Sequence, residues 1–199
     1  MLREADPMNT NINQSGATTS QLRLKKNQTL VLSKPSGHQR IAIDLAAGLL
    51  RISTCHRDDQ NDITFALMSP LECGTFHYPR TCQLRLEALA ETNLSICYDI
   101  PQNIDTETDD FLSEWLLELH YVRNPAKAEE RVSALLRLLA ERFGKRTPEG
   151  MRLDFLLPHA RIAEMIGTTR STVSRTLSSM RKTEEISIDE LREILVIYL

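Results

Sequence analysis

Hydrophobic and polar positions alternate with a period of two through much of residues 21–100, which predicts β-strands. In the segment 83–91, leucines and alanines alternate with charged or amide side chains, the pattern of a strand with one buried face. The apolar stretches 49–55 and 63–69 flank a polar, loop-like segment, which predicts a β-hairpin. Many short strands joined by frequent turns predict an antiparallel roll or barrel.

Residues 1–20 are polar, rich in Asn, Thr and Ser, and poor in large apolar side chains. Such a segment buries too little apolar surface to offset the entropy of ordering its backbone. We therefore expect residues 1–20 to form a flexible tail.

After residue 105 the spacing of apolar residues changes to three and four, which predicts a helix over residues 106–123. Acidic residues crowd the start of this segment, where the helix dipole favours negative charge. Four large apolar side chains share one face of the helix. They are Phe111, Trp115, Leu119 and Val122. A short helix with both Phe and Trp needs a surface that covers them, either on its own domain or on a second copy of the chain.

A further helix is expected over residues 126–143, and a pair of short helices over 159–182. Ala163 is small at the point where the two short helices would cross. Gly167 permits the positive φ angle that a tight turn between them needs. The spacing therefore predicts a helix-turn-helix whose second helix runs over residues 169–181.

One face of this second helix suits contact with double-stranded DNA. Val173, Leu177 and Met180 have the spacing of core residues, so the other face is exposed. That face holds arginines, which can bind guanine through two hydrogen bonds, and hydroxyls, which suit phosphates and base edges. The first hydroxyl of the set can also cap the helix. The expected DNA-contacting residues are Thr169, Arg170, Ser171, Thr172, Arg175 and Ser178.

A β-hairpin is expected directly after this helix, over residues 186–199, because two apolar stretches flank a polar tip. A hairpin in this place is a wing, so the segment reads as a winged helix. The charge distribution agrees with DNA binding. The net charge of the chain is −3, but residues 159–182 hold the basic residues Arg161, Arg170, Arg175, Arg181 and Lys182 against the single acid Glu164.

Composition excludes several classes of protein. A hydrophobic content of 41% and a charged content of 26% are ordinary for a soluble globular protein. No apolar run approaches the ~20 residues of a membrane span, and no signal peptide is visible, so we expect a cytoplasmic protein without a membrane partner. The four cysteines are scattered singly, so no metal site is expected. No nucleophile elbow, phosphate loop or zinc signature is present, so we do not expect an enzyme.

The segment IAEMIGTTRSTVSRTLSSMRK resembles the helix-turn-helix signature of the Crp/Fnr family of bacterial transcription regulators. Within that family it is similar to the cyanobacterial global nitrogen regulators. The segment LLRISTCHRDDQNDITFALMSP is similar to the family's β-roll sensor, which shares the fold of cyclic-nucleotide-binding domains. The resemblance implies an α+β fold with four parts. These are a flexible tail (1–20), an antiparallel β-roll sensor (21–104), a dimerisation helix (105–125) and a winged helix-turn-helix domain (126–199).

The same resemblance implies a sequence-specific regulator of transcription, expected to be an activator that also meets RNA polymerase. It implies a homodimer joined through Phe111, Trp115, Leu119 and Val122. Two recognition helices would then enter successive major grooves of a pseudo-palindromic operator, about one helical turn (~34 Å) apart.

The sensor region departs from the family's ligand-binding members. The Gly-Glu pair of the cyclic-nucleotide binders is absent, and the arginines that hold 2-oxoglutarate in the nitrogen regulators are replaced by Leu84 and Ala126. We therefore expect no cofactor, and neither a cyclic nucleotide nor 2-oxoglutarate as effector. If a small effector binds, the expected residues are Gly74, Thr75, Arg80, Arg85 and Arg123.

A second hypothesis stays open beside the regulator. The β-roll and the helix with Trp115 would form a protein-interaction module that binds a regulatory protein partner. The two differ in an observable way, because only the regulator is expected to select a DNA sequence.

Overall fold

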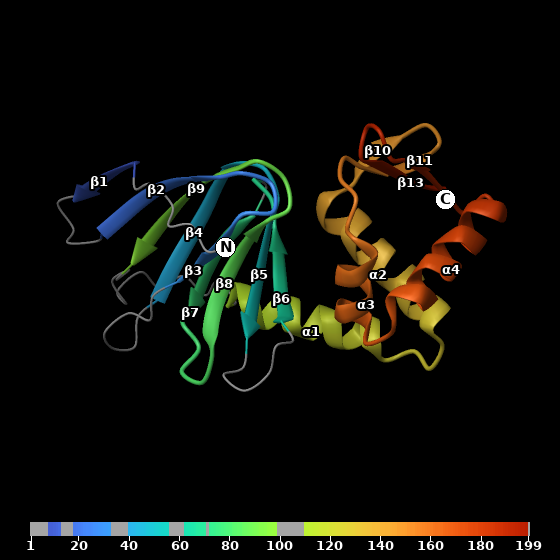
Figure 1. Ribbon diagram of the computed structural model, residues 1–199, viewed down its shortest axis with the longest axis horizontal. Helices are drawn as coiled ribbons and strands as arrows, with labels where there is room; N and C mark the ends of the chain where they lie inside the picture. Colours follow the sequence, from blue (N-terminus) through green and yellow to red (C-terminus); the bar gives the residue numbers. More distant parts are fainter. Residues whose placement is uncertain are drawn as a thin grey trace. The chain divides into compact units, whose positions relative to one another are not determined.

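The structure is a computed structural model that describes residues 8–12, 18–32, 40–55, 62–70, 72–98 and 110–198. Contacts divide the chain into two compact units, Met1–Leu116 and Leu117–Leu199, and the division falls inside one helix. The first unit holds the strands β1–β9 and the second holds most of the helices (Figure 1).

The first unit contains two antiparallel sheets. One sheet has the order β1 (Met8–Ile12), β2 (Thr18–Leu24), β9 (Thr92–Tyr98), β4 (Arg40–Ala47) and β7 (Cys73–His77). The other has the order β3 (Thr29–Val31), β8 (Gln83–Ala88), β5 (Leu50–Cys55) and β6 (Asp62–Met68). Neighbours that are distant in sequence, such as β2 and β9, pair along their length, as in a roll.

The expected alternation is present in both sheets. On β4, Ile41, Ile43 and Leu45 are buried while the residues between them are less so. On β8, Leu84 and Leu86 are fully buried. Each such side chain contributes ~1.5–3 kcal/mol by leaving water, so these faces hold the core of the unit. The predicted hairpin is confirmed, because β5 and β6 pair antiparallel.

The N-terminal segment differs from the flexible tail predicted for residues 1–20. Met8–Ile12 and Thr18–Leu24 form strands that pair with each other, and the second also pairs with β9. The tail prediction relied on the lack of apolar side chains. Main-chain hydrogen bonds between Thr18–Leu24 and β9 join this strand to the sheet, and such bonds do not require apolar side chains.

Helix α1 (Phe111–Arg123) follows the strands. Asp110 caps it, because its carboxylate accepts from the Ser113 amide at 3.1 Å. The other carboxylate oxygen accepts from the amide of His77 at 3.0 Å and so ties the start of α1 to β7. Among the helices that the structure describes, none has both the length and the apolar content of a membrane span.

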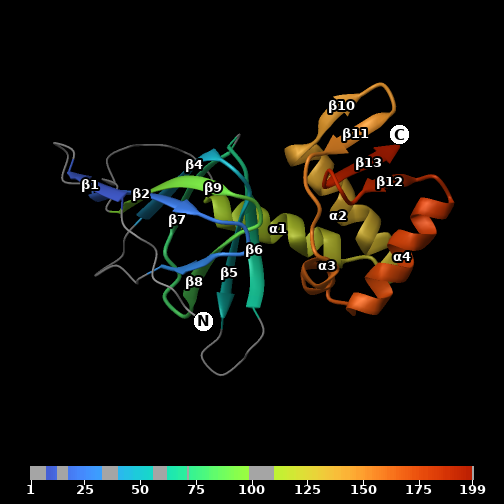
Figure 2. The same cartoon turned by 45° about the horizontal axis from the view of Figure 1, so that its top comes forward.

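The second unit is a winged helix. Its elements are α2 (Ala128–Phe143), β10 (Lys145–Thr147), β11 (Gly150–Leu153), α3 (His159–Ile166), α4 (Arg170–Lys182), β12 (Ile186–Asp189) and β13 (Ile194–Tyr198). The strands form one antiparallel sheet of order β10-β11-β13-β12. The hairpin β12–β13 comes directly after α4 and extends this sheet (Figure 2). The predicted α+β class and the wing are therefore confirmed.

Candidate nucleic-acid interface

The turn between α3 and α4 is fixed by backbone geometry. Gly167 adopts φ 65° and ψ 51°, the left-handed conformation predicted for it. The amide of Thr168 donates to the carbonyl of Ala163 at 2.9 Å and closes the turn. A Cβ at Gly167 would meet only the Nη1 of Arg131, at 3.9 Å, so conformation rather than space requires glycine here.

Two arginines that the sequence analysis did not assign to the turn also stabilise it. Arg123 donates to the carbonyl of Met165 at 2.6 Å, and Arg131 donates to that of Ile166 at 3.3 Å. These carbonyls lie in the last turn of α3, where a helix leaves acceptors without intrahelical partners. The two guanidinium groups therefore hold the end of α3 in place from outside the motif.

Thr169 caps α4 as predicted. Its Oγ1 accepts from the amide of Thr172 at 3.2 Å and lies 2.9 Å from the hydroxyls of Ser171 and Thr172. Three hydroxyls and the amides of the first helical turn thus gather at one point. Such a helix start is a binding place for a phosphate group.

The inner face of α4 holds the helix in the domain. Val173 is fully buried, and Leu177 and Met180 are buried as predicted. Thr176, which the spacing did not single out, is also buried.

The outer face of α4 is a line of exposed polar residues. At 100° per residue, positions 171, 175, 178 and 182 fall on the side opposite the buried residues. All four are exposed, and Arg170 is exposed on the flank. We call Arg170, Ser171, Arg175, Ser178 and Lys182 the reading face. The structure thus places four of the six predicted residues on this face and the other two, Thr169 and Thr172, at the start of the helix. It adds Lys182, which its spacing from Arg175 could have shown.

The charged residues of the domain are arranged so that positive potential is concentrated on this face of α4. Helix α4 has no acidic residue, and Arg181 and Lys182 lie in its last turn. The tip of the wing, in contrast, combines Asp189, Glu190 and Glu193 with Arg192, and it bears the exposed Leu191. An anionic duplex is therefore attracted to α4 rather than to the wing tip.

Two of the predicted effector arginines already have partners. Arg85 on β8 donates to Asp62 on β6 at 2.8 Å. Arg123 donates to Met165, as described above. Gly74 lies against the flexible end of the Met68 side chain, which would have to shift to admit a Cβ. Thr75 lies on β7 and Arg80 in the loop after it.

The predicted interface residues of α1 are all buried within the chain itself. Phe111, Trp115, Leu119 and Val122 have exposed fractions between 0% and 5%. The exposed apolar residues of the helix are Leu116 (43%), Leu117 (55%) and Tyr121 (62%). The monomer therefore covers the stripe that the sequence analysis identified, and it leaves a different set of apolar side chains accessible.

Comparison with known proteins adds to this geometry. Residues 130–198 match the Crp-like helix-turn-helix domain family. A probable transcriptional activator of Rhizobium leguminosarum bv. viciae is 37% identical over 87 residues, which cover 44% of this chain and 35% of that protein. The global nitrogen regulator of Synechocystis sp. is 45% identical over 58 residues, which cover 29% of this chain and 26% of that protein. The match thus spans about a third or less of each curated relative.

Solved structures are similar over most of the chain. FixK2 from Bradyrhizobium japonicum matches with a TM-score of 0.66 at 16% identity, over 90% of this chain and 92% of that one. A CooA variant from Carboxydothermus hydrogenoformans matches with a TM-score of 0.63 at 23% identity, over 90% and 83%. At these identities the likeness establishes the fold.

The turn, the capped second helix and the following hairpin define a helix-turn-helix protein of the winged-helix class. Residues 130–198 therefore form a Crp-like helix-turn-helix domain, and the chain as a whole has the fold of the FixK2 and CooA structures.

Proposed function

We propose that this chain is a sequence-specific DNA-binding regulator that activates transcription as a homodimer on a pseudo-palindromic operator. The observation that supports it most directly is the reading face. Exposed arginines and hydroxyls stand on a rigid helix whose inner side is fully packed and whose start is capped. In such an arrangement the folded helix already holds the hydrogen-bond donors in place, so they can meet base edges without a separate ordering step.

The roles follow from position. The N-terminus of α4, with Thr169 and Thr172, binds a backbone phosphate and sets the register of the helix. Ser171 and Arg175 lie on the outermost line of the helix and read bases, Arg175 preferring guanine. Arg170 and Ser178 contact phosphates or base edges beside them.

The homodimer forms through α1. Leu116, Leu117 and Tyr121 are large apolar side chains that the monomer leaves accessible on this helix. Burial of these side chains against a second copy of the chain stabilises the dimer. The interface residues predicted from the sequence contribute indirectly, because they are buried within the monomer and hold α1 in place. The two recognition helices then meet half-sites about one helical turn (~34 Å) apart.

The input side of the regulator works without a cyclic nucleotide or 2-oxoglutarate. The ion pair between Arg85 and Asp62 and the bond from Arg123 to Met165 support this, because both guanidinium groups have partners within the protein. The protein acts in the cytoplasm with RNA polymerase. The name of the Rhizobium relative supports activation rather than repression.

Selection from a pool of random duplexes tests the proposal. The full chain is incubated with the pool at physiological salt, and bound DNA is recovered, amplified and sequenced over several rounds. Enrichment of an inverted repeat with half-site centres ~10 base pairs apart is expected. Enrichment of no motif would overturn the proposal. A stoichiometric protein partner recovered in that case would instead favour the interaction-module hypothesis.

A further inference from the structure

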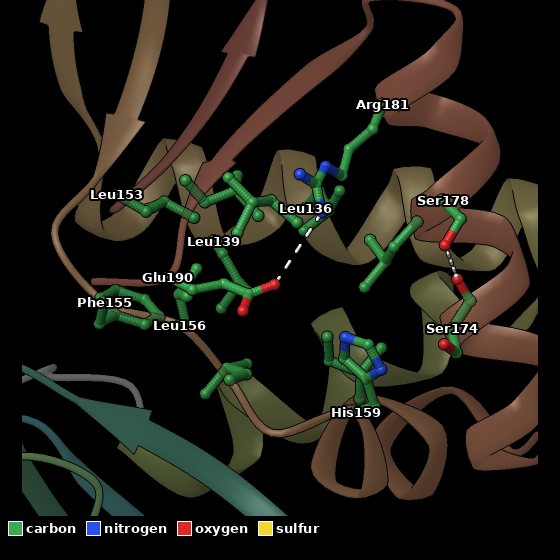
Figure 3. A pocket seen from close by; sticks show the side chains of 15 residues that line it. Leu136, Leu139, Leu153, Phe155, Leu156, His159, Ser174, Ser178, Arg181 and Glu190 are labelled. Atoms are coloured by element: carbon green, nitrogen blue, oxygen red, sulfur yellow. Dashed lines mark hydrogen bonds and ion pairs between the residues drawn. The ribbon is translucent and has the colours of Figure 1, made fainter. Parts of the chain in front are cut away.

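A cavity of about 170 Å³ lies inside the C-terminal domain, between α4 and the wing. Its walls come from α2, β11, the loop before α3, α3 itself, α4 and the β12–β13 hairpin. Figure 3 shows leucine side chains at its centre, with Arg181, Ser178, Ser174, His159 and Glu190 arranged around them. Of the residues proposed to contact DNA, Ser178 also lines this cavity.

The interior of the cavity is apolar. Leu136, Leu139, Leu153 and Leu177 line it and are themselves buried. An apolar cavity of about 150 Å³ is large enough to hold a benzene ring. The interior therefore suits one ring or a compact aliphatic group, and a larger cofactor does not fit.

The rim of the cavity is polar and has one exchangeable charge pair. Arg181 of α4 lies 3.9 Å from Glu190 at the wing tip, and their side chains are 50% and 80% exposed. A long, exposed ion pair of this kind contributes little to stability. The guanidinium can therefore exchange Glu190 for another carboxylate with little loss.

We propose that this cavity binds a small aromatic monocarboxylate. The ring occupies the leucine-lined interior, and the carboxylate replaces Glu190 on Arg181 through two parallel hydrogen bonds. Burial of the ring supplies the affinity, and the arginine supplies the preference for an acid over a neutral or cationic compound of the same size.

The position of the cavity connects ligand binding with DNA binding. This connection rests on the proposed function. Helix α4 contributes Ser174, Leu177 and Arg181 to the cavity wall. Ser174 directly precedes Arg175, which belongs to the reading face. Binding also releases Glu190, which ties the wing tip to the end of α4. The ligand thus acts on the reading helix and on the wing at once, and it changes the affinity for the operator.

Binding is tested on the full chain without DNA, by calorimetric titration with benzoate, benzyl alcohol and benzylamine. Benzoate is expected to bind most tightly. Arg181→Gln is expected to weaken benzoate at least tenfold while leaving benzyl alcohol unchanged, since only the charge-assisted bonds are lost. The matched control is Arg192→Gln, which changes an arginine in the turn of the β12–β13 hairpin that is not part of the cavity wall. Equal binding of the three compounds, or no effect of Arg181→Gln, would overturn the proposal.

A second arm separates the cavity from its effect on DNA. Ser174→Leu adds volume to the cavity wall and is expected to abolish benzoate binding, with circular dichroism confirming that the domain is folded. Operator affinity is then measured with and without benzoate in the wild-type chain and in Ser174→Leu. A benzoate response in the wild type alone is expected. Benzoate binding without any response would overturn the coupling, and this outcome is distinct from a failure of DNA binding, which is measured without benzoate.

Discussion

In the proposed mode of DNA binding, Arg175 is the residue on which base recognition depends most directly. It lies one helical turn after Ser171, is exposed, and points away from the buried Val173 and Leu177. Its side chain therefore has no folding role that would confuse the outcome of a substitution.

Arg175→Ala is expected to lower the affinity for the selected operator by ~1–3 kcal/mol and to relax the preference at one base pair of each half-site. Fluorescence anisotropy on a set of single-base operator variants measures both effects. The control is Arg137→Ala, which removes an exposed arginine from α2. Equal losses on all operator variants would show that Arg175 contacts phosphate instead.

Arg51 shows what the pattern of the sequence could not predict. It stands in an apolar stretch of β5, yet its side chain is fully buried. It donates to Thr64 at 2.7 Å and to Glu87 at 2.8 Å. These partners come from β6 and β8, so only the pairing of the strands brings them together.

Arg51→Ala is expected to lower the free energy of unfolding by about 3–5 kcal/mol, because it removes the buried guanidinium that pairs with the mostly buried carboxylate of Glu87. Urea denaturation measures the loss. Arg23→Ala serves as the control, since it breaks an ion pair with Glu91 in which both side chains are more than half exposed, and it is expected to change stability by less than ~1 kcal/mol. Similar effects of the two substitutions would contradict this account of Arg51.

At the scale of elements, α1 shows which features can be predicted from the sequence and which cannot. The spacing of Phe111 and Trp115 located the apolar stripe, because periodicity depends only on the helix itself. Which surface covers that stripe depends on tertiary packing, and the monomer covers it. The turn after α3 was predictable for the opposite reason, since Gly167 and Thr169 act within a few residues of chain.

The dimer prediction belongs to this helix. Leu117→Glu places a charge among the exposed apolar residues of α1 and is expected to convert the dimer to a monomer at micromolar concentration. Analytical ultracentrifugation measures the change. Leu191→Glu makes the same substitution at the wing tip, where the leucine is 98% exposed, and is expected to leave the dimer intact. A Leu117→Glu chain that still sediments as a dimer would exclude this face as the interface.

The hairpin β10–β11 ends on a carboxylate between two cations. Arg152 donates a hydrogen bond to Asp154 at 2.7 Å, and Lys145 donates another to the same carboxylate at 2.6 Å. These bonds hold the pKa of Asp154 below its usual value. The stabilisation is therefore present at neutral pH and is lost as the pH falls through the lowered pKa.

Comparison of wild type with Asp154→Asn over a range of pH tests this site. The wild type is expected to be the more stable chain at pH 7, and the difference in unfolding free energy is expected to shrink steadily as the pH falls below the usual range of a carboxyl group. Urea denaturation at each pH gives the two values. A difference that does not depend on pH would contradict the account.

At the scale of the whole molecule, the sequence predicted the order of a β-rich unit, a helix and a winged helix, and the structure has this order. The strand pairing of Met8–Ile12 was missed, because main-chain bonds give no signal in side-chain pattern. The cavity beside α4 was missed as well, since its walls come from segments far apart in the chain. Local motifs were therefore accessible to sequence reasoning, and sites assembled from several elements were not.

The central claim is that the intact chain recognises a DNA sequence through α4. The most direct measurement is the affinity of the full chain for its selected inverted repeat, compared with a scrambled duplex of equal length and composition at the same physiological salt. The account predicts at least ~10³-fold tighter binding to the inverted repeat. Equal affinity for the two duplexes would contradict it.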